Sequence, residues 1–139
     1  MFKGKTYSEL QIGESASMSK TVSESDIYMF AGITGDFNPM HVNEEYAKKT
    51  KFKTRIAHGG LTAGLIAPVL GLMLPGEGTI VSSLLVNFLA PVKIGDTITS
   101  KVEVAEKNEE KKNVKMLLEW INQQNTRVAF GEAVVYPPK

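Results

Sequence analysis

The sequence predicts an α+β fold in which one antiparallel sheet wraps around one long buried helix. The first observation is an apolar stretch over residues 61–74 in which leucines recur at roughly helical spacing. The second is a series of four later segments rich in Val, Ile, Thr and aromatic residues, with turn signals between them. The third is the length of 139 residues, which suits one core and predicts a single domain over residues 1–139.

The chain is expected to begin its regular structure with a strand over residues 16–22 and a short helix. Ser23 is suited to cap that helix, because Asp26 follows three residues later as a variant of the capping box. The helix should run from Glu24 to about Gly32, since Gly32 and Gly35 interrupt it.

A polar, loop-rich segment with a short helix is expected next, over residues 34–55. Pro39 disfavours helix at Asn38 and predicts a turn there. Asn43 can cap a short helix over residues 44–49. This segment should overhang the sheet.

The apolar stretch at residues 61–74 is expected to be one long central helix. Leu61, Leu65 and Leu72 recur at roughly helical spacing, and other apolar residues fill much of the circumference, so the helix should be buried on most sides. The Pro75-Gly76 pair should end it.

Four strands are expected to follow as an antiparallel meander, over residues 79–89, 97–107, 113–122 and 127–136. Alternation is clearest at Ile98, Ser100, Val102 and Val104, which should face one way. The charged run at 108–113 is typical of a solvated hairpin turn. One sheet around one apolar helix is the hotdog arrangement. It leaves a sheet edge and one side of the helix partly open, so pairing with a second copy is expected.

The composition excludes several classes of function. With 16 basic and 15 acidic residues the net charge is +1, which argues against a dedicated nucleic-acid binder but is compatible with a local patch for one phosphorylated ligand. The absence of cysteine removes disulfides, thiolate metal sites and a cysteine nucleophile, and suits the cytoplasmic location that we expect. No signal peptide and no membrane association are expected, since the longest apolar stretch is too short to cross a bilayer.

The candidate chemistry lies on the loop from Gly35 to His41. A turn around Pro39 would bring Asp36 and His41 together, and a carboxylate beside an imidazole can hold one water and move protons. The same Asp-x-Asn-Pro pattern is typical of an ordinary turn, in which Asp and Asn bond their own backbone. On the residues alone both interpretations stand.

His58, Gly59 and Gly60 directly precede the apolar helix. They are compatible with a plain loop at a helix start, or with an oxyanion site in which free N–H groups meet a substrate that glycine allows to approach closely. We interpret His58 itself as structural. Two histidines at the spacing of His41 and His58 do not match a metal-binding helix pair, so no metal site is expected.

The loop belongs to a longer pattern, F-A-G-I-T-G-D-F-N-P-M-H at positions 30–41, followed by Ala47. This pattern resembles the hydratase-2 motif of the MaoC-like (R)-specific enoyl-CoA hydratases. R-I-A-H-G at 55–59, and F-L-A-P-V at 88–92 with Gly95 and Asp96, resemble the same family, although these two are shared more widely among hotdog proteins. The three stretches follow one another as they do in the family, so the resemblance covers nearly the whole chain.

The resemblance implies a hotdog homodimer, or a higher oligomer, that acts as a hydro-lyase of fatty-acid metabolism. Its substrate would be a trans-2-enoyl thioester of coenzyme A, hydrated to the (R)-3-hydroxyacyl-CoA, with no cofactor besides the coenzyme A of the substrate. Asp36 and His41 would be catalytic, Asn38 would support them, and the Gly59 N–H would bind the thioester carbonyl.

The chain departs from the family at two positions. Ala67 stands where some relatives carry a serine, and Gly60 stands where a bulkier apolar residue is frequent, which would alter the acyl pocket. Leu61 and Leu65 are expected to limit the depth of the acyl tail. A hotdog acyl-CoA thioesterase and a non-catalytic acyl-CoA-binding protein are the alternatives, and an acyl carrier protein in place of coenzyme A is a further one.

Overall fold

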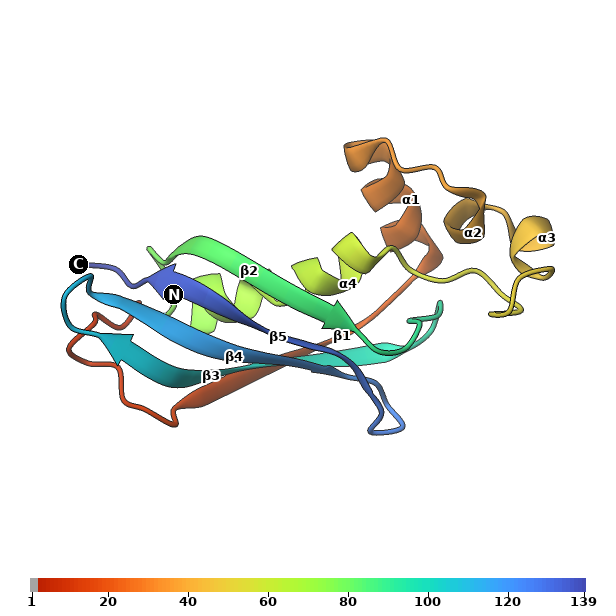
Figure 1. Cartoon of the computed structure of the whole chain (residues 1–139). Coiled ribbons are helices and arrows are strands. Elements are labelled where there is room, and N and C mark those ends of the chain that lie inside the picture. The colour runs from red at the N-terminus through yellow and green to blue at the C-terminus, as the bar shows by residue number, and fades with distance from the viewer. Residues whose placement is uncertain (1–2) are drawn as a thin grey trace.

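The computed structural model describes residues 3–139 and contains a five-stranded antiparallel sheet with a central helix lying across one face (Figure 1). The strand order is β1-β3-β4-β5-β2. The strands are β1 (Ser15–Thr21), β2 (Ile80–Phe88), β3 (Thr97–Asn108), β4 (Asn113–Ile121) and β5 (Arg127–Tyr136). All five lie within a residue or two of the ranges that the sequence predicts, and the α+β hotdog fold class is confirmed.

The expected four-strand meander is wrong in one connection. β3, β4 and β5 do follow one another, but β2 pairs with β5 at one edge instead of with β3. The segment after β2 crosses the end of the sheet: the Leu89 N–H donates to Val128 in β5, and the Gly95 N–H donates to Val22 beyond β1. The sheet curls around the helix, so β2 is at the edge opposite β1.

The inner face of the sheet forms the core. Ile98, Ser100, Val102 and Val104 are all buried, as their alternation predicts. β4 repeats the pattern, with Met116 and Trp120 fully buried between half-exposed neighbours. The turn predicted between β3 and β4 is also confirmed, since Asn108 pairs with Asn113 at its base.

The first helix, α1 (Glu24–Thr34), begins as predicted. The Ser23 side chain accepts from the Asp26 N–H, and the Asp26 carboxylate accepts from the Ser23 N–H, which completes the capping box. The helix continues past Gly32 and ends at Gly35, whose φ of 83° is a left-handed conformation that glycine adopts without strain.

The excursion after α1 is more helical than predicted. Asn38 caps a short helix, α2 (Pro39–Val42), by accepting from the Met40 N–H, and Pro39 occupies its first turn. The turn expected at Pro39 is therefore a helix start. Asn43 caps α3 (Glu44–Ala47) as predicted.

The central helix is not continuous, which corrects the expectation of one long helix. An α-helical part, α4 (Gly59–Gly64), is followed by a turn and then by a π-helical part, η1 (Val69–Met73). Pro68 has no N–H to donate to the carbonyl of Gly64, and the neighbouring bonds from Leu65 and Ile66 shorten to span three residues.

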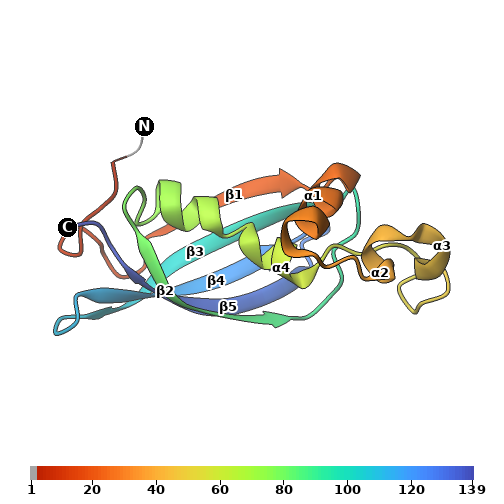
Figure 2. The same ribbon diagram turned by 90° about the horizontal axis from the view of Figure 1, so that it is seen from above.

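One side of this segment stays open in a single chain. Ile66, Val69 and Leu70 are buried against the sheet, whereas Leu72 is 55% exposed. Figure 2 shows the segment crossing the sheet between β1 and β2, with α1 to α3 beyond one end. Among residues 3–139, no helix combines the length and apolar character needed to cross a membrane.

Candidate active site

Helices α1 to α3 overhang one end of the sheet and carry the candidate catalytic loop (Figure 2). Arg55 ties this overhang together, because its guanidinium donates to Glu24 and Tyr28 of α1 and to Glu44 of α3, at 2.9, 2.9 and 3.1 Å. The hydrogen bond from Tyr28, followed by that from Arg55, holds the pKa of the Glu24 carboxyl below its ordinary value. The loop between α1 and α3 is thus fixed at both ends.

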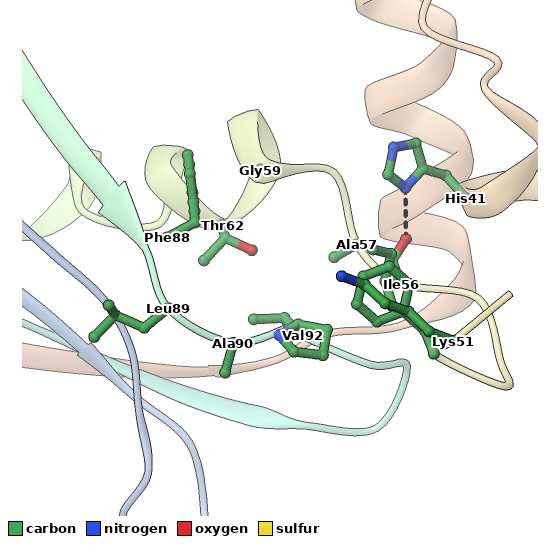
Figure 3. A pocket seen from close by; sticks show the side chains of 12 residues that line it. His41, Lys51, Ile56, Ala57, Gly59, Thr62, Phe88, Leu89, Ala90 and Val92 are labelled. Atoms are coloured by element: carbon green, nitrogen blue, oxygen red, sulfur yellow. Dashed lines mark hydrogen bonds between the residues drawn. The ribbon is translucent and has the colours of Figure 1, made fainter.

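His41 lies on α2 and is 7% exposed. Its Nδ1 lies 2.7 Å from the Ile56 carbonyl oxygen, a bond drawn in Figure 3. A carbonyl only accepts, so Nδ1 carries a proton, and in a neutral ring Nε2 has the free lone pair. The imidazole is therefore oriented by the backbone and keeps one nitrogen for chemistry.

Asp36 lies on the loop between α1 and α2 and is exposed. One oxygen of its carboxylate accepts from the Asn38 N–H at 3.1 Å. A carboxylate oxygen of Asp36 and a ring nitrogen of His41 lie within 4.8 Å of each other, as the predicted turn requires. The pair can share one water molecule, which is the geometry that proton transfer needs.

His58 joins the same cluster, where the sequence spacing does not predict it. Its ring stacks on that of His41 with centroids 4.0 Å apart, and its Nε2 donates to the Asp36 carbonyl oxygen at 2.9 Å. It is 2% exposed. The contacts fit the structural interpretation of His58 and add that it fixes both candidate catalytic residues.

Asn38 lies next to Asp36 and His41, but its side-chain oxygen is already used in a hydrogen bond. Its Oδ1 caps α2 through the Met40 N–H, and its own N–H holds Asp36. Asn38 therefore shapes the turn that brings Asp36 to His41.

Gly59 and Gly60 form the first turn of α4, where N–H groups have no acceptor inside the helix. A Cβ on Gly59 would lie 3.1 Å from the ring of Phe88, and a Cβ on Gly60 would lie 2.7 Å from the ring of Phe30. The absence of side chains lets these two rings pack onto the helix start. Phe30 fills the space that a bulkier residue at position 60 would need.

A pocket of about 340 Å³ opens beside His41 and Gly59 (Figure 3). Its lining comes from α2, from the loop before α4, from α4, and from the end of β2 with the segment that follows it: His41, Lys51, Phe52, Ile56, Ala57, Gly59, Thr62, Phe88, Leu89, Ala90, Pro91 and Val92. The isolated bridge between Ile56 and Lys93 holds the first and last of these segments side by side. Most of the lining is apolar.

The residues expected in the acyl pocket lie elsewhere. Leu61 is buried in the core and Leu65 packs against it, and neither lines the cavity beside His41. Their role with the acyl tail stays a prediction. The sequence does not point to Lys51, Phe52 or Thr62, whereas the R-I-A-H-G stretch at 55–59 and the F-L-A-P-V stretch at 88–92 signal the rest of the wall.

Asp36, His41 and His58 are also the residues that could hold a metal ion, since a donor atom from each lies within 4.8 Å of the others. One nitrogen of each ring is already bound to a backbone carbonyl. The remaining donors suit either an ion or a water molecule. The expectation that no metal is needed stays a prediction.

Comparison with known proteins places this geometry in a family. The family model described as "MaoC like domain" matches residues 9–125. An (R)-specific enoyl-CoA hydratase of Rhodospirillum rubrum is 56% identical over 108 residues, which cover 78% of this chain and 75% of that protein. A 3-hydroxybutyryl-CoA dehydratase of Methylorubrum extorquens is 45% identical over 133 residues, covering 96% and 84%.

The same likeness extends to solved structures. An R-hydratase of Pseudomonas aeruginosa in its unliganded form superposes with a TM-score of 0.92 at 39% sequence identity, over 98% of this chain and 87% of that one. The overhang, the interrupted helix and the sheet are all within the superposed length.

Proposed function

This chain belongs to the MaoC-like domain family, and we propose that it hydrates a trans-2-enoyl-CoA to the (R)-3-hydroxyacyl-CoA and catalyses the reverse dehydration. It is a hydro-lyase acting on intermediates of fatty-acid metabolism. The observation that carries the proposal is the meeting of Asp36 and His41 within 4.8 Å, beside a pocket that Gly59 also lines.

The thioester would be activated at the start of α4. Its carbonyl polarises the adjacent double bond, so C3 becomes electrophilic. The Gly59 N–H would donate to the carbonyl oxygen as enolate charge develops there. The position of Gly59 in the first turn of α4 supports this role, because an N–H there has no acceptor inside the helix and is free to donate.

Asp36 and His41 would hold one water on a single face of the substrate. The pair removes a proton from the water as its oxygen attacks C3, and returns a proton to C2. Both groups lie on one short segment, so addition is syn. The Nδ1 bond of His41 supports this, since it leaves Nε2 as a base in the neutral ring.

The test is hydration of crotonyl-CoA by the wild type and by Asp36→Asn and His41→Gln variants. Each variant should lose roughly two to four orders of magnitude in kcat while its circular dichroism is unchanged. Glu110→Gln, on the exposed turn between β3 and β4, is a control that should hydrate normally. Chiral analysis of the product should give the (R) alcohol.

Three outcomes would contradict the proposal. Near-normal turnover by either site variant would remove that residue from the mechanism. Release of free coenzyme A, followed with a thiol reagent, would indicate a thioesterase, and binding of crotonyl-CoA without either reaction would indicate a non-catalytic protein.

We further propose that the protein is a homodimer in the cytoplasm. It would need no cofactor besides the coenzyme A of its substrate. The support for pairing is the edge strand β2, where Ile80, Leu84 and Leu85 are 66%, 47% and 57% exposed. A second copy added there would bury these side chains and the open side of the central helix. A chain without cysteine needs no oxidising compartment to fold.

A further inference from the structure

The pocket beside His41 has one cationic wall. Lys51 is the one lysine among its lining residues, and in Figure 3 its side chain lies with Ile56 on the wall formed by the loop before α4. Its ammonium lies 5.3 Å from the centroid of the Phe52 ring, which also lines the pocket. The rest of the lining is largely apolar, so this charge stands out.

Lys51 belongs to a concentrated run of positive charge. Residues 48–55 contain four lysines, one arginine and no acidic residue, in a chain whose net charge is only +1. Lys48 pairs with Glu45, and Arg55 pairs with Glu24 and Glu44. Within residues 3–139, no carboxylate lies within 4.0 Å of the ammonium groups of Lys49, Lys51 or Lys53.

The backbone that presents these lysines is held in place. Thr50 donates from its hydroxyl to the Ala47 carbonyl, and the Phe52 and Lys53 N–H groups bond back to Thr50. Ala47 is fully buried beneath them. Three lysines without a carboxylate partner thus lie on one ordered turn, and Lys51 among them lines the pocket. Binding an anion to this turn requires little further ordering.

The positive charge of Lys51 determines which end of an acyl-CoA lies beside it. An alkyl tail there would desolvate an ammonium with no compensating partner, which is unfavourable. A phosphate would instead form a charge-assisted hydrogen bond with it. Coenzyme A carries its phosphates at the far end of the pantetheine arm from the thioester, so the carrier end matches this wall and the acyl tail does not.

We propose that this pocket is the carrier side of the active site and that Lys51, with Lys49 and Lys53, binds the phosphates of coenzyme A. The inference rests on the proposed function and deepens it. It assigns the direction of the substrate: the pantetheine arm leaves His41 and Gly59 between residues 51–56 and 88–92, and the acyl tail leaves away from them.

The experiment compares crotonyl-CoA with crotonyl-pantetheine, which lacks every phosphate. Lys51→Gln should lower the ratio of kcat/KM for the two substrates about tenfold, through KM of the coenzyme A thioester, since one charged hydrogen bond is lost. Lys51→Glu should lower the ratio further. The preference of the wild type for crotonyl-CoA should also weaken as salt is raised.

Lys101→Gln is the matched control, because Lys101 is an exposed lysine on β3 with its neighbours Ser100 and Val102 facing the core. It should leave the ratio unchanged. An unchanged ratio in both Lys51 variants, with the wild type active, would overturn the inference and leave the proposed function standing. If Lys51→Gln instead lowered kcat/KM for a crotonyl thioester of acyl carrier protein and left that for crotonyl-CoA unchanged, the inference would also be overturned. No turnover of either thioester by the wild type would overturn both.

Discussion

At the scale of single residues, the two ring nitrogens of His58 have different surroundings. Nε2 donates to the Asp36 carbonyl, whereas the buried Nδ1 has no partner within residues 3–139. The ring lies between Phe30, with centroids 4.7 Å apart, and His41. His58 is therefore a positioning residue that fixes the loop of Asp36 against the ring of His41.

Replacing His58 should separate positioning from chemistry. His58→Leu should lower kcat for crotonyl-CoA roughly ten- to a hundredfold with little change in KM, because Asp36 would lose its anchor. His58→Gln, which keeps a donor for the Asp36 carbonyl, should recover part of that loss. Equal losses in the two variants, or a change in KM alone, would contradict the positioning role.

The sequence brings Asp36 and His41 forward as a pair because they are close along the chain, and the family motif favours a catalytic role for them over an ordinary turn. It does not identify the surroundings of His58 or Lys51, whose neighbours are remote in sequence. His58 reaches Asp36 only because α4 starts beneath the loop. Lys51 reaches the wall at residues 88–92 only because Ile56 pairs with Lys93. Such contacts depend on tertiary packing, which local patterns do not encode.

At the scale of elements, the capping box of α1 predicts a dependence on pH. Hydrogen bonding from the Ser23 N–H, and then from Lys20, holds the pKa of the Asp26 carboxyl below its ordinary value of 3.8. The folded state therefore binds this proton less readily than the unfolded chain. The stabilisation is complete above the ordinary pKa and is lost as the pH falls through the lower pKa of the folded state.

Asp26→Ala should accordingly cost about 1 kcal/mol of unfolding free energy near neutral pH. The difference from the wild type should shrink below pH 3.8, as urea unfolding at a series of pH values can measure. Glu45→Ala is the control, because this carboxylate is 81% exposed in its pair with Lys48 and should contribute little. A difference that is constant with pH would contradict the explanation.

The central helix shows where element prediction fails. Apolar spacing correctly locates the segment and its buried side, but the break around residues 65–66 arises from one missing backbone donor at Pro68. The order of strands fails for a different reason. Its content of β-branched and aromatic residues identifies β2 as a strand, yet only the curl of the sheet decides that its partner is β5.

At the scale of the whole molecule, the exposed apolar residues of the edge strand β2 predict a homodimer. Leu84 lies opposite Ala133, a fully buried residue of the inner face, and is itself 47% exposed. Leu84→Lys should therefore shift the protein from a dimer to a species near 15.2 kDa in light scattering, since a charge there opposes burial. Activity should fall with it, because the end of β2 also lines the pocket through Phe88.

Ile12→Lys provides the control for that experiment. Ile12 is 61% exposed on the turn before β1, away from β2, and the variant should keep the mass and turnover of the wild type. A monomeric wild type, or a Leu84→Lys protein of unchanged mass, would rule out pairing through β2.

The two edges of the sheet differ in a way that limits growth of the assembly. The sequence of β1 is Ser-Ala-Ser-Met-Ser-Lys-Thr, in which five of the seven residues are polar, whereas six of the nine residues of β2 are apolar. Addition of β2 to the β1 of another copy would be a head-to-tail contact, which forms an open filament unless the rotation between copies closes a ring. It would also remove water from the hydroxyl groups of β1 and from Lys20. In the proposed dimer, the β2 strands of both copies would meet across a two-fold axis and leave no apolar edge exposed. The polar β1 edges that remain would then disfavour the formation of fibres.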